Sequence, residues 1–518
     1  MTRAARRAAA LLLAAALAAC GGSDTPAADG PLLWPDAPLV IISVDTLRAD
    51  RLGAWGYGRG TSPRLDALAA ESVLFEECLA SGCKTAESHM SLFTSLPPTL
   101  HGVHNYSPRL QIQPRALAEN RLTLAQVLRR AGRFNSAVAC GGQITAPMGF
   151  QRGFEERFTS ELVDVSVIVD RALAAVDAAL AQDKPWMLFT HTYQVHGPYL
   201  PPRRFRERFA PDLHGTVGER VRKLEGLSFG EQWKAMFPVF WKDLHLFTDE
   251  DARLLSDLYD GEIAYTDEQL GRLLEGLQQR GVYDRAIVVV LSDHGEEFGE
   301  HGHFEHDQLY RELLHVPLLV RLPGGRLGGT RVQGQCGLVD VMPTLLDLLA
   351  LEGPDTLAGR SLVPAMTSGG TPGDAVVSER LMFADSYAAS LRTPDTTLLY
   401  RFDPAALQSD ERPGPGPEPG RPAGEGRIEV FDRRSDPGER QDLGSRAPAW
   451  PAATSGFYRR LAALFELSAR LDEVSTGTEV VLSAEQIEEL VKLGYTGTGA
   501  AQLPAGTPLD RWPAHAGR

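Results

Sequence analysis

Short runs of apolar, β-branched residues that end in polar side chains recur along the first 350 positions. The clearest is Ala-Ile-Val-Val-Val-Leu at 286–291, which gives way to Ser-Asp-His-Gly at 292–295. A run of this length is too short for a membrane helix and is typical of a strand buried on both faces. Similar runs at 39–44 and 186–190 end in Asp45 and His191.

Stretches with helical periodicity separate these strands. Apolar residues recur every three or four positions at 64–70, 122–131, 163–182, 251–279 and 339–350. The alternation of strand and helix through 39–350 predicts a large, mainly parallel α/β sheet sandwiched by helices. From about residue 375 the pattern changes to two strands, 397–402 and 428–431, joined by a Pro/Gly-rich loop at 412–426.

The first twenty residues have the pattern of an export signal. Arginines at positions 3, 6 and 7 precede a short Ala/Leu core that ends in Leu-Ala-Ala-Cys at 17–20. This ending also resembles a bacterial lipobox, in which Cys20 is lipidated and anchors the chain to the membrane of the cell envelope, facing the periplasm or at the outer membrane. The alternative is a plain signal peptide in which Cys20 is incidental.

Composition narrows the class of protein without naming it. The net charge of −15 and the lack of a Lys/Arg-rich run argue against a nucleic-acid partner. Four cysteines follow Cys20, too few to be the disulfide framework of a 518-residue chain. A pair between Cys83 and either Cys78 or Cys140 is conceivable, Cys336 has no assigned partner, and the pairing stays open.

The polar residues at the strand ends suit a metal-dependent reaction. The carboxyl ends of parallel strands meet at one edge of a sheet, so Asp45, Asp293 and His294 are expected to share one divalent cation. Thr85 is expected at the start of a helix, where its hydroxyl can bind the same ion and act as a nucleophile. Histidines nearby can protonate a leaving oxygen near neutral pH.

Several motifs, in the same order, resemble the sulfatase branch of the alkaline phosphatase superfamily over about residues 38–495. They are Val-Asp-Thr-Leu-Arg-Ala-Asp at 44–50, Ser-His-Met-Ser-Leu-Phe-Thr at 88–94, His-Gly at 101–102, Ser-Asp-His-Gly at 292–295, Gly-Glu-His-Gly at 299–302, Asp-Val-Met-Pro-Thr-Leu-Leu-Asp at 340–347 and Leu-Gly-Tyr at 493–495. The resemblance implies an eight- to ten-stranded sheet with a smaller antiparallel C-terminal sheet.

The residue patterns, together with this resemblance, predict a division of the chain. Its parts are a lipoprotein signal peptide at 1–20, a tether at 21–37, a sulfatase-like catalytic domain at 38–375 with a covering insertion at 203–250, a C-terminal subdomain at 376–495 and a mobile tail at 496–518.

The nucleophile departs from the family pattern. Sulfatases use a formylglycine made from the cysteine of Cys-x-Pro/Ala-x-Arg, and this motif is absent. Aligning on Ser-Leu-Phe-Thr at 91–94 puts Thr85 at the cysteine position and His89 at the arginine position. Related phosphoglycerol and phosphoethanolamine transferases and phosphodiesterases use threonine. The family's acidic pair is also altered, because Thr46 follows Asp45.

The remaining roles follow from the same register. His196 and His306 fall where the family places anion-binding or leaving-group residues, and His191 and Arg48 are expected to contact the substrate. The expected cofactor is manganese, zinc or, least comfortably, calcium. The resulting hypothesis is a hydrolase in which Thr85 attacks a sulfate or phosphate ester of a small molecule, glycan or lipid headgroup. The alternatives are a phosphodiesterase or headgroup transferase, and a binding protein that has lost turnover.

Overall fold

The central sheet is mainly parallel, as the sequence predicts. Its strand order is β10-β2-β9-β5-β1-β4-β3, with β8 added on β2. The pairs β1–β4, β1–β5, β3–β4 and β2–β10 are parallel, whereas β9 runs antiparallel to β5 and β2. The strands are β1 Leu39–Val44, β2 Val73–Leu79, β3 Phe134–Ala139, β4 Trp186–Thr192, β5 Ile287–Leu291, β8 His315–Val316, β9 Leu318–Arg321 and β10 Arg331–Gly337.

The chain is described by a computed structural model. It covers residues 30–104, 115–140, 142–155, 162–242, 247–373, 375–382, 386–402 and 427–444. The chain divides after Leu33, and the fold described here belongs to the unit that begins at Trp34. The signal peptide with Cys20, most of the tether, the 412–426 loop and the tail lie outside the described residues and stay predictions.

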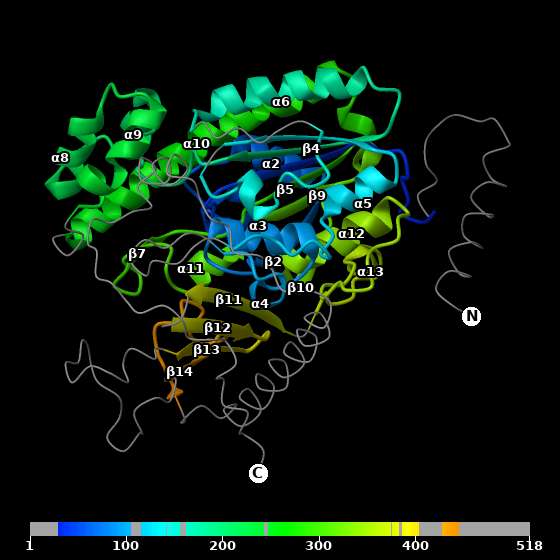
Figure 1. Cartoon of the computed structure of the whole chain (residues 1–518). Helices are drawn as coiled ribbons and strands as arrows, with labels where there is room; N and C mark the ends of the chain where they lie inside the picture. The colour runs from blue at the N-terminus through cyan, green and yellow to red at the C-terminus, as the bar shows by residue number, and fades with distance from the viewer. Residues whose placement is uncertain are drawn as a thin grey trace, which may run out of the picture. The chain divides into compact units, whose positions relative to one another are not determined.

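Helices cover both faces of the sheet. Figure 1 shows α6 (Val165–Leu180) and α10 (Asp249–Gln279) along one face and α3 (Thr85–Thr94) and α12 (Val341–Leu348) on the other. Also present are α2 Pro63–Ala70, α4 Pro98–His101, α5 Leu124–Arg130, α7 Arg203–Phe209, α8 Gly215–Leu224, α9 Phe229–Ala235, α11 Arg311–Leu314 and α13 Val363–Ser368. The central strands β1, β4 and β5 are wholly buried because helices cover both faces of the sheet there.

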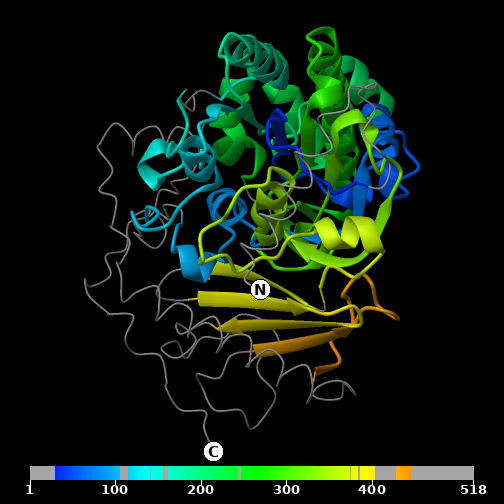
Figure 2. The same cartoon turned by 90° about the vertical axis from the view of Figure 1, so that its right-hand side faces the viewer.

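The second sheet is small and antiparallel, in the order β11-β12-β13-β14. Its strands are β11 Val376–Met382, β12 Ser386–Arg392, β13 Thr396–Phe402 and β14 Arg427–Asp432, and Figure 2 shows them stacked beneath the larger sheet. A two-stranded ribbon, β6 (Glu297–Phe298) with β7 (Phe304–Glu305), follows β5. This architecture confirms the predicted fold class.

The segment 203–250 holds α7, α8 and α9, and several of its aromatic side chains are buried, although Phe237 is exposed. Phe205, Phe209, Trp233 and Phe240 are buried in the same core that includes β1, β4 and β5. Among the described residues, no helix has both the length and the apolar character needed to cross a bilayer.

Candidate active site

Three neighbouring parallel strands bring the candidate metal ligands to one edge of the sheet. Ser43 of β1 pairs with His191 of β4 and with Leu291 of β5, so the carboxyl ends of these strands are level. Asp45 and Asp293 follow directly, at adjacent positions along this edge. Both carboxylates are buried, with 0% and 1% of their surfaces exposed.

The turn after β1 has a strained backbone conformation that places an N–H group against Asp293. Thr46 has a φ of 55°, a left-handed conformation that a β-branched residue rarely adopts. In this conformation its backbone N–H donates to Asp293 Oδ1 over 3.3 Å. Tyr259 of α10 fixes the same turn, because its hydroxyl donates to the Thr46 carbonyl over 2.6 Å.

Thr85 is the first residue of α3, as predicted, and its hydroxyl reaches the same edge. Thr85 Oγ1 donates to Asp45 Oδ2 over 3.2 Å and lies 3.4 Å from His294 Nε2. One turn later in the helix, Ser88 Oγ donates to the Asp293 carbonyl over 2.6 Å. Residues 40 and 209 positions from Thr85 therefore meet around its hydroxyl.

The two carboxylates fit a divalent cation. Asp45 Oδ1 and Asp293 Oδ2 are buried and have no hydrogen-bond partner among the described residues. Burial, followed by the charges of Asp293 and Glu296, raises the pKa of Asp45 well above its usual range, and burial also raises the pKa of Asp293. Ligand atoms of Asp45, Asp293 and His294 lie within 4.8 Å of one another. A cation between them would satisfy both oxygens and offset the repulsion.

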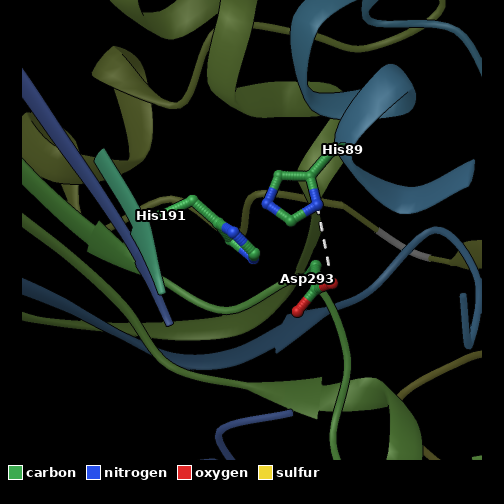
Figure 3. A group of neighbouring side chains, drawn as sticks. All are labelled: His89, His191 and Asp293. Carbon is green, nitrogen blue, oxygen red and sulfur yellow. Dashed lines mark ion pairs between the residues drawn. The ribbon is translucent and has the colours of Figure 1, made fainter. Parts of the chain in front are cut away.

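His89 and His191 approach Asp293 from α3 and β4 (Figure 3). His89 Nδ1 donates to the Thr85 carbonyl over 2.8 Å, and Ser43 Oγ donates to His89 Nε2 over 2.8 Å. Both ring nitrogens of His89 are thus committed to the fold. His191 Nε2 donates to Asp45 Oδ2 over 3.2 Å, while its buried Nδ1 has no partner among the described residues.

His196, His294 and His306 share one hydrogen-bonding arrangement. In each, Nδ1–H donates to a main-chain carbonyl: Gly197 over 2.8 Å, Gly295 over 3.0 Å and Cys83 over 3.1 Å, respectively. This fixes the tautomer and leaves Nε2 available toward the site. The Nε2 atoms of His196 and His306 are 3.0 Å apart, and the ring centres of His294 and His306 are 4.5 Å apart.

Comparison with known proteins identifies the family. The family model described as Sulfatase matches residues 38–351. The chain belongs to the sulfatase family. An arylsulfatase of Clostridium perfringens is 23% identical over 383 residues, which cover 62% of this chain and 77% of that protein.

Other relatives match locally or by fold. Arylsulfatase K of Bos taurus is 36% identical over 119 residues, which cover 23% of this chain and 22% of that protein. A phosphonate monoester hydrolase of Agrobacterium radiobacter has a similar structure, with a TM-score of 0.61 at 21% identity over 87% of this chain and 99% of that one. A 2-O GAG sulfatase gives a TM-score of 0.61 at 19% identity over 86% and 95% of the two chains.

Within this sulfatase-family site, Arg48 stands apart from the other expected residues. Its guanidinium donates to both oxygens of Asp50, over 2.9 and 2.8 Å, to Glu300 Oε1 over 2.6 Å and to the Glu296 carbonyl over 3.0 Å. These acceptors tie the loop after β1 to the β6 segment. The structure therefore gives Arg48 a role in the fold, and its donors are engaged there.

Lys84 is the residue that sequence reasoning missed. It precedes Thr85 as the N-cap of α3, and its ammonium group pairs with Asp307 over 2.5 Å. Its position beside the candidate nucleophile was the available signal, but Lys84 belongs to no motif that carries the resemblance.

The four cysteines 78, 83, 140 and 336 are buried free thiols. Cys78 of β2 faces Cys336 of β10 in the strand register, rather than Cys83 or Cys140. A surface cavity of about 540 Å³ lies elsewhere, along Leu200–Arg206 and the facing residues Glu225, Gly226 and Gln232. None of the candidate catalytic residues lines it, so its size says nothing about the reaction.

Proposed function

We propose that the chain is a metal-dependent hydrolase in which Thr85 Oγ1 attacks a sulfate or phosphate ester in line. The observation that carries this proposal is the placement of the Thr85 hydroxyl, 3.2 Å from Asp45 Oδ2 and 3.4 Å from His294 Nε2. A hydroxyl at the first turn of a helix, next to a base and to candidate metal ligands, has the surroundings of an activated nucleophile.

Asp45 is positioned to take the proton of the nucleophile. Its Oδ2 accepts the hydrogen bond from the Thr85 hydroxyl and so lies within reach of the proton that this hydroxyl loses. His191 also donates to Oδ2 and so holds the carboxylate in that orientation. As the Thr85 oxygen forms its bond to phosphorus or sulfur, the ester oxygen leaves on the opposite side.

Asp45, Asp293, His294 and Thr85 would hold the cation. A divalent ion bound there lowers the pKa of the hydroxyl and stabilises the negative charge that develops on the ester oxygens. The ligand set of carboxylate oxygens with one imidazole suits manganese or zinc better than calcium.

His196 and His306 are the proposed donors to the leaving oxygen. Their Nδ1–H groups are occupied by carbonyls, so a proton delivered to substrate must come from the Nε2 side, where the two rings meet. Burial, then neighbouring positive charge, lowers the pKa of His196 to about 3 and that of His306 well below its usual value. Near neutral pH neither ring therefore carries an Nε2 proton on its own, so the negative charge of the bound ester has to raise the pKa of one ring before that ring can act as the acid.

The nucleophile favours phosphorus over sulfur. A formylglycine lets a sulfated intermediate collapse by elimination, but a sulfated threonine must be displaced at sulfur by water. A phosphorylated threonine is hydrolysed at phosphorus without that difficulty. The fold shared with a phosphonate monoester hydrolase is consistent with a phosphorus-centred ester, as are the alternatives of a phosphodiesterase or a headgroup transferase.

The test is the activity of purified protein on aryl sulfate, phosphate monoester, phosphodiester and phosphonate monoester substrates with added manganese or zinc. We expect Thr85→Ala to lower the turnover rate of the best ester at least 10³-fold. Thr85→Ser should keep part of the wild-type turnover rate, and Cys83→Ala should keep all of it. Turnover that survives in Thr85→Ala but is lost in Cys83→Ala would overturn the assignment. A wild-type protein that binds metal but turns over no ester would support the binding-protein alternative.

A further inference from the structure

The site needs a positive charge for the anionic oxygens of an ester, and its histidines do not supply one. In each of the five, the ring N–H donates to a protein acceptor and is not free for an anion: a main-chain carbonyl in four of them and Asp45 Oδ2 in the fifth. They are His89, His191, His196, His294 and His306. His89, which stands at the family's arginine position, also has both nitrogens engaged by Ser43 and the Thr85 carbonyl.

Lys84 is placed to supply that charge. Lys84 directly precedes Thr85, its neighbour Cys83 accepts a hydrogen bond from His306, and its counter-ion Asp307 directly follows His306, so the loops that carry the nucleophile and this histidine are held together at Lys84.

We propose that Lys84 is a substrate-binding residue that pairs with an anionic oxygen of the ester, and that Asp307 holds its ammonium group until substrate displaces it. This rests on the proposed function. The Lys84 side chain is 24% exposed and that of Asp307 is 52% exposed, so the pair borders solvent. An ion pair this exposed contributes little stability and is exchanged easily. An oxyanion drawn into the drier site would interact with Lys84 more strongly.

The charges of the site also indicate a class of substrate. Asp45 and Asp293 carry two negative charges, which a divalent cation balances, and Lys84 then adds one positive charge. A group with a single negative charge matches this balance: a phosphate diester, a phosphonate monoester or a sulfate monoester. A phosphate monoester with two negative charges would leave one of them uncompensated in a buried site, so we expect monoanionic esters to be preferred.

Kinetics of Lys84→Met, Lys84→Arg and Asp307→Asn test this assignment. With bis(p-nitrophenyl) phosphate, we expect Lys84→Met to raise KM and lower kcat/KM 10- to 100-fold, and Lys84→Arg to lose less than 5-fold. Asp307→Asn should lower KM or leave it unchanged, because it removes the competing counter-ion. Lys184→Met, in the exposed loop before β4, is the matched control and should behave as wild type.

Two outcomes would overturn the role of Lys84. One is a kcat/KM of Lys84→Met within threefold of wild type on every monoanionic ester. The other is an equal loss in Lys84→Met and Asp307→Asn, which would show that the pair only holds two loops together. Folding of each variant is checked by its thermal unfolding midpoint.

A binding measurement separates this inference from the nucleophile assignment. In the Thr85→Ala background, inorganic phosphate at pH 6, mostly the monoanion, and sulfate are titrated with and without Lys84→Met. We expect Lys84→Met to weaken anion binding at least fivefold, whether or not Thr85 is the nucleophile. Equal binding by the two proteins would overturn the role of Lys84 and leave the role of Thr85 untouched.

Discussion

At the scale of single residues, the site is defined by two buried carboxylates that lack compensation from the protein. Asp293 Oδ1 accepts from the Thr46 N–H, and Asp45 Oδ2 accepts from Thr85 and His191. The other oxygen of each carboxylate has no hydrogen-bond partner in the described part of the chain, and Asp293 Oδ2 lies 3.5 Å from His89 Nδ1 and 3.4 Å from His294 Nε2. Two buried negative charges this close oppose folding unless a proton or a cation lies between them.

Metal removal should therefore destabilise the wild-type protein more than a variant with one carboxylate neutralised. With saturating manganese or zinc, we expect the wild type to gain about 2–4 kcal/mol of unfolding free energy over the chelated protein. Asp45→Asn should gain less than about 1 kcal/mol from metal, and without metal it should be at least as stable as wild type. Denaturant unfolding with and without a chelator measures all four values.

Asp170→Asn is the control for this comparison, because Asp170 is an exposed aspartate paired with Arg272 on the surface of α6. It should respond to metal as the wild type does. If Asp45→Asn were stabilised by metal as much as wild type, Asp45 would not be a ligand.

At the scale of elements, the sequence predicts the central strands and those at 397–402 and 428–431, but it misses β10, β11 and β12. Leu39–Val44 and Ile287–Leu291 are uniformly apolar or nearly so, and each lies in the buried middle of the sheet. Arg331–Gly337 has polar residues and glycines at alternating and adjacent positions, because it is an edge strand with a register shift. The strands β11 and β12 were missed because their composition does not favour a strand, and they are strands because of their pairing with neighbouring strands.

The positions of candidate site residues could be predicted where a motif residue directly follows a strand. Asp45, Asp293 and His294 follow this rule, since parallel strands align their carboxyl ends. Lys84 and the strained Thr46 turn were not predictable in this way. Their roles depend on which loops face each other. Lys84 and Asp307 lie 223 positions apart in the sequence, as do the hydrogen-bonded neighbours Cys83 and His306, and only folding brings them together.

Glu262 ties the helix α10 to the end of β4, and it makes stability depend on pH. Its carboxylate accepts from Leu200 N over 2.7 Å and from Gln194 Nε2 over 2.9 Å, yet burial outweighs these bonds and raises the pKa of Glu262 to about 8. The folded state thus holds a proton that the unfolded state has lost above about pH 4.3. The contribution of Glu262 to stability is fully present below that pH and is lost as pH rises toward 8.

Glu262→Gln removes this titration. Relative to wild type, we expect the variant to gain about 2–4 kcal/mol in unfolding free energy between pH 5 and pH 8. Urea unfolding across this range measures the difference. Glu268→Gln, an exposed position on the same helix, is the control and should follow the wild-type curve. Parallel curves for Glu262→Gln and wild type would show that Glu262 is ionised in the folded protein.

At the scale of the whole molecule, the small sheet supports the loop that carries the nucleophile. Ser378 Oγ of β11 donates to the Ala80 carbonyl over 2.6 Å, and Glu379 N donates to the Ser81 carbonyl over 2.8 Å. The Glu379 carboxylate continues this contact, because it accepts from Thr99 N at the start of α4 over 2.9 Å. The C-terminal sheet thus packs against the 80–85 loop and hydrogen-bonds to it, and α3 begins at the end of this loop.

Gly82 is the point of closest approach between this loop and the small sheet, and it should be sensitive to a single methyl group. A Cβ at Gly82 would lie 2.6 Å from the Glu379 carbonyl oxygen, a main-chain atom that cannot turn aside. Gly82→Ala should therefore displace the loop and with it Lys84 and Thr85. Because displacements near 1 Å can cost about 100-fold in rate, we expect kcat to fall 10- to 100-fold while the unfolding free energy falls by about 1–3 kcal/mol.

Gly58→Ala is the matched control, because its Cβ would meet nothing within 4 Å, and it should keep wild-type kcat. Steady-state kinetics on the best ester, read with the unfolding midpoints, decide the matter: a Gly82→Ala protein with unchanged kcat would show that the small sheet does not set the position of the nucleophile.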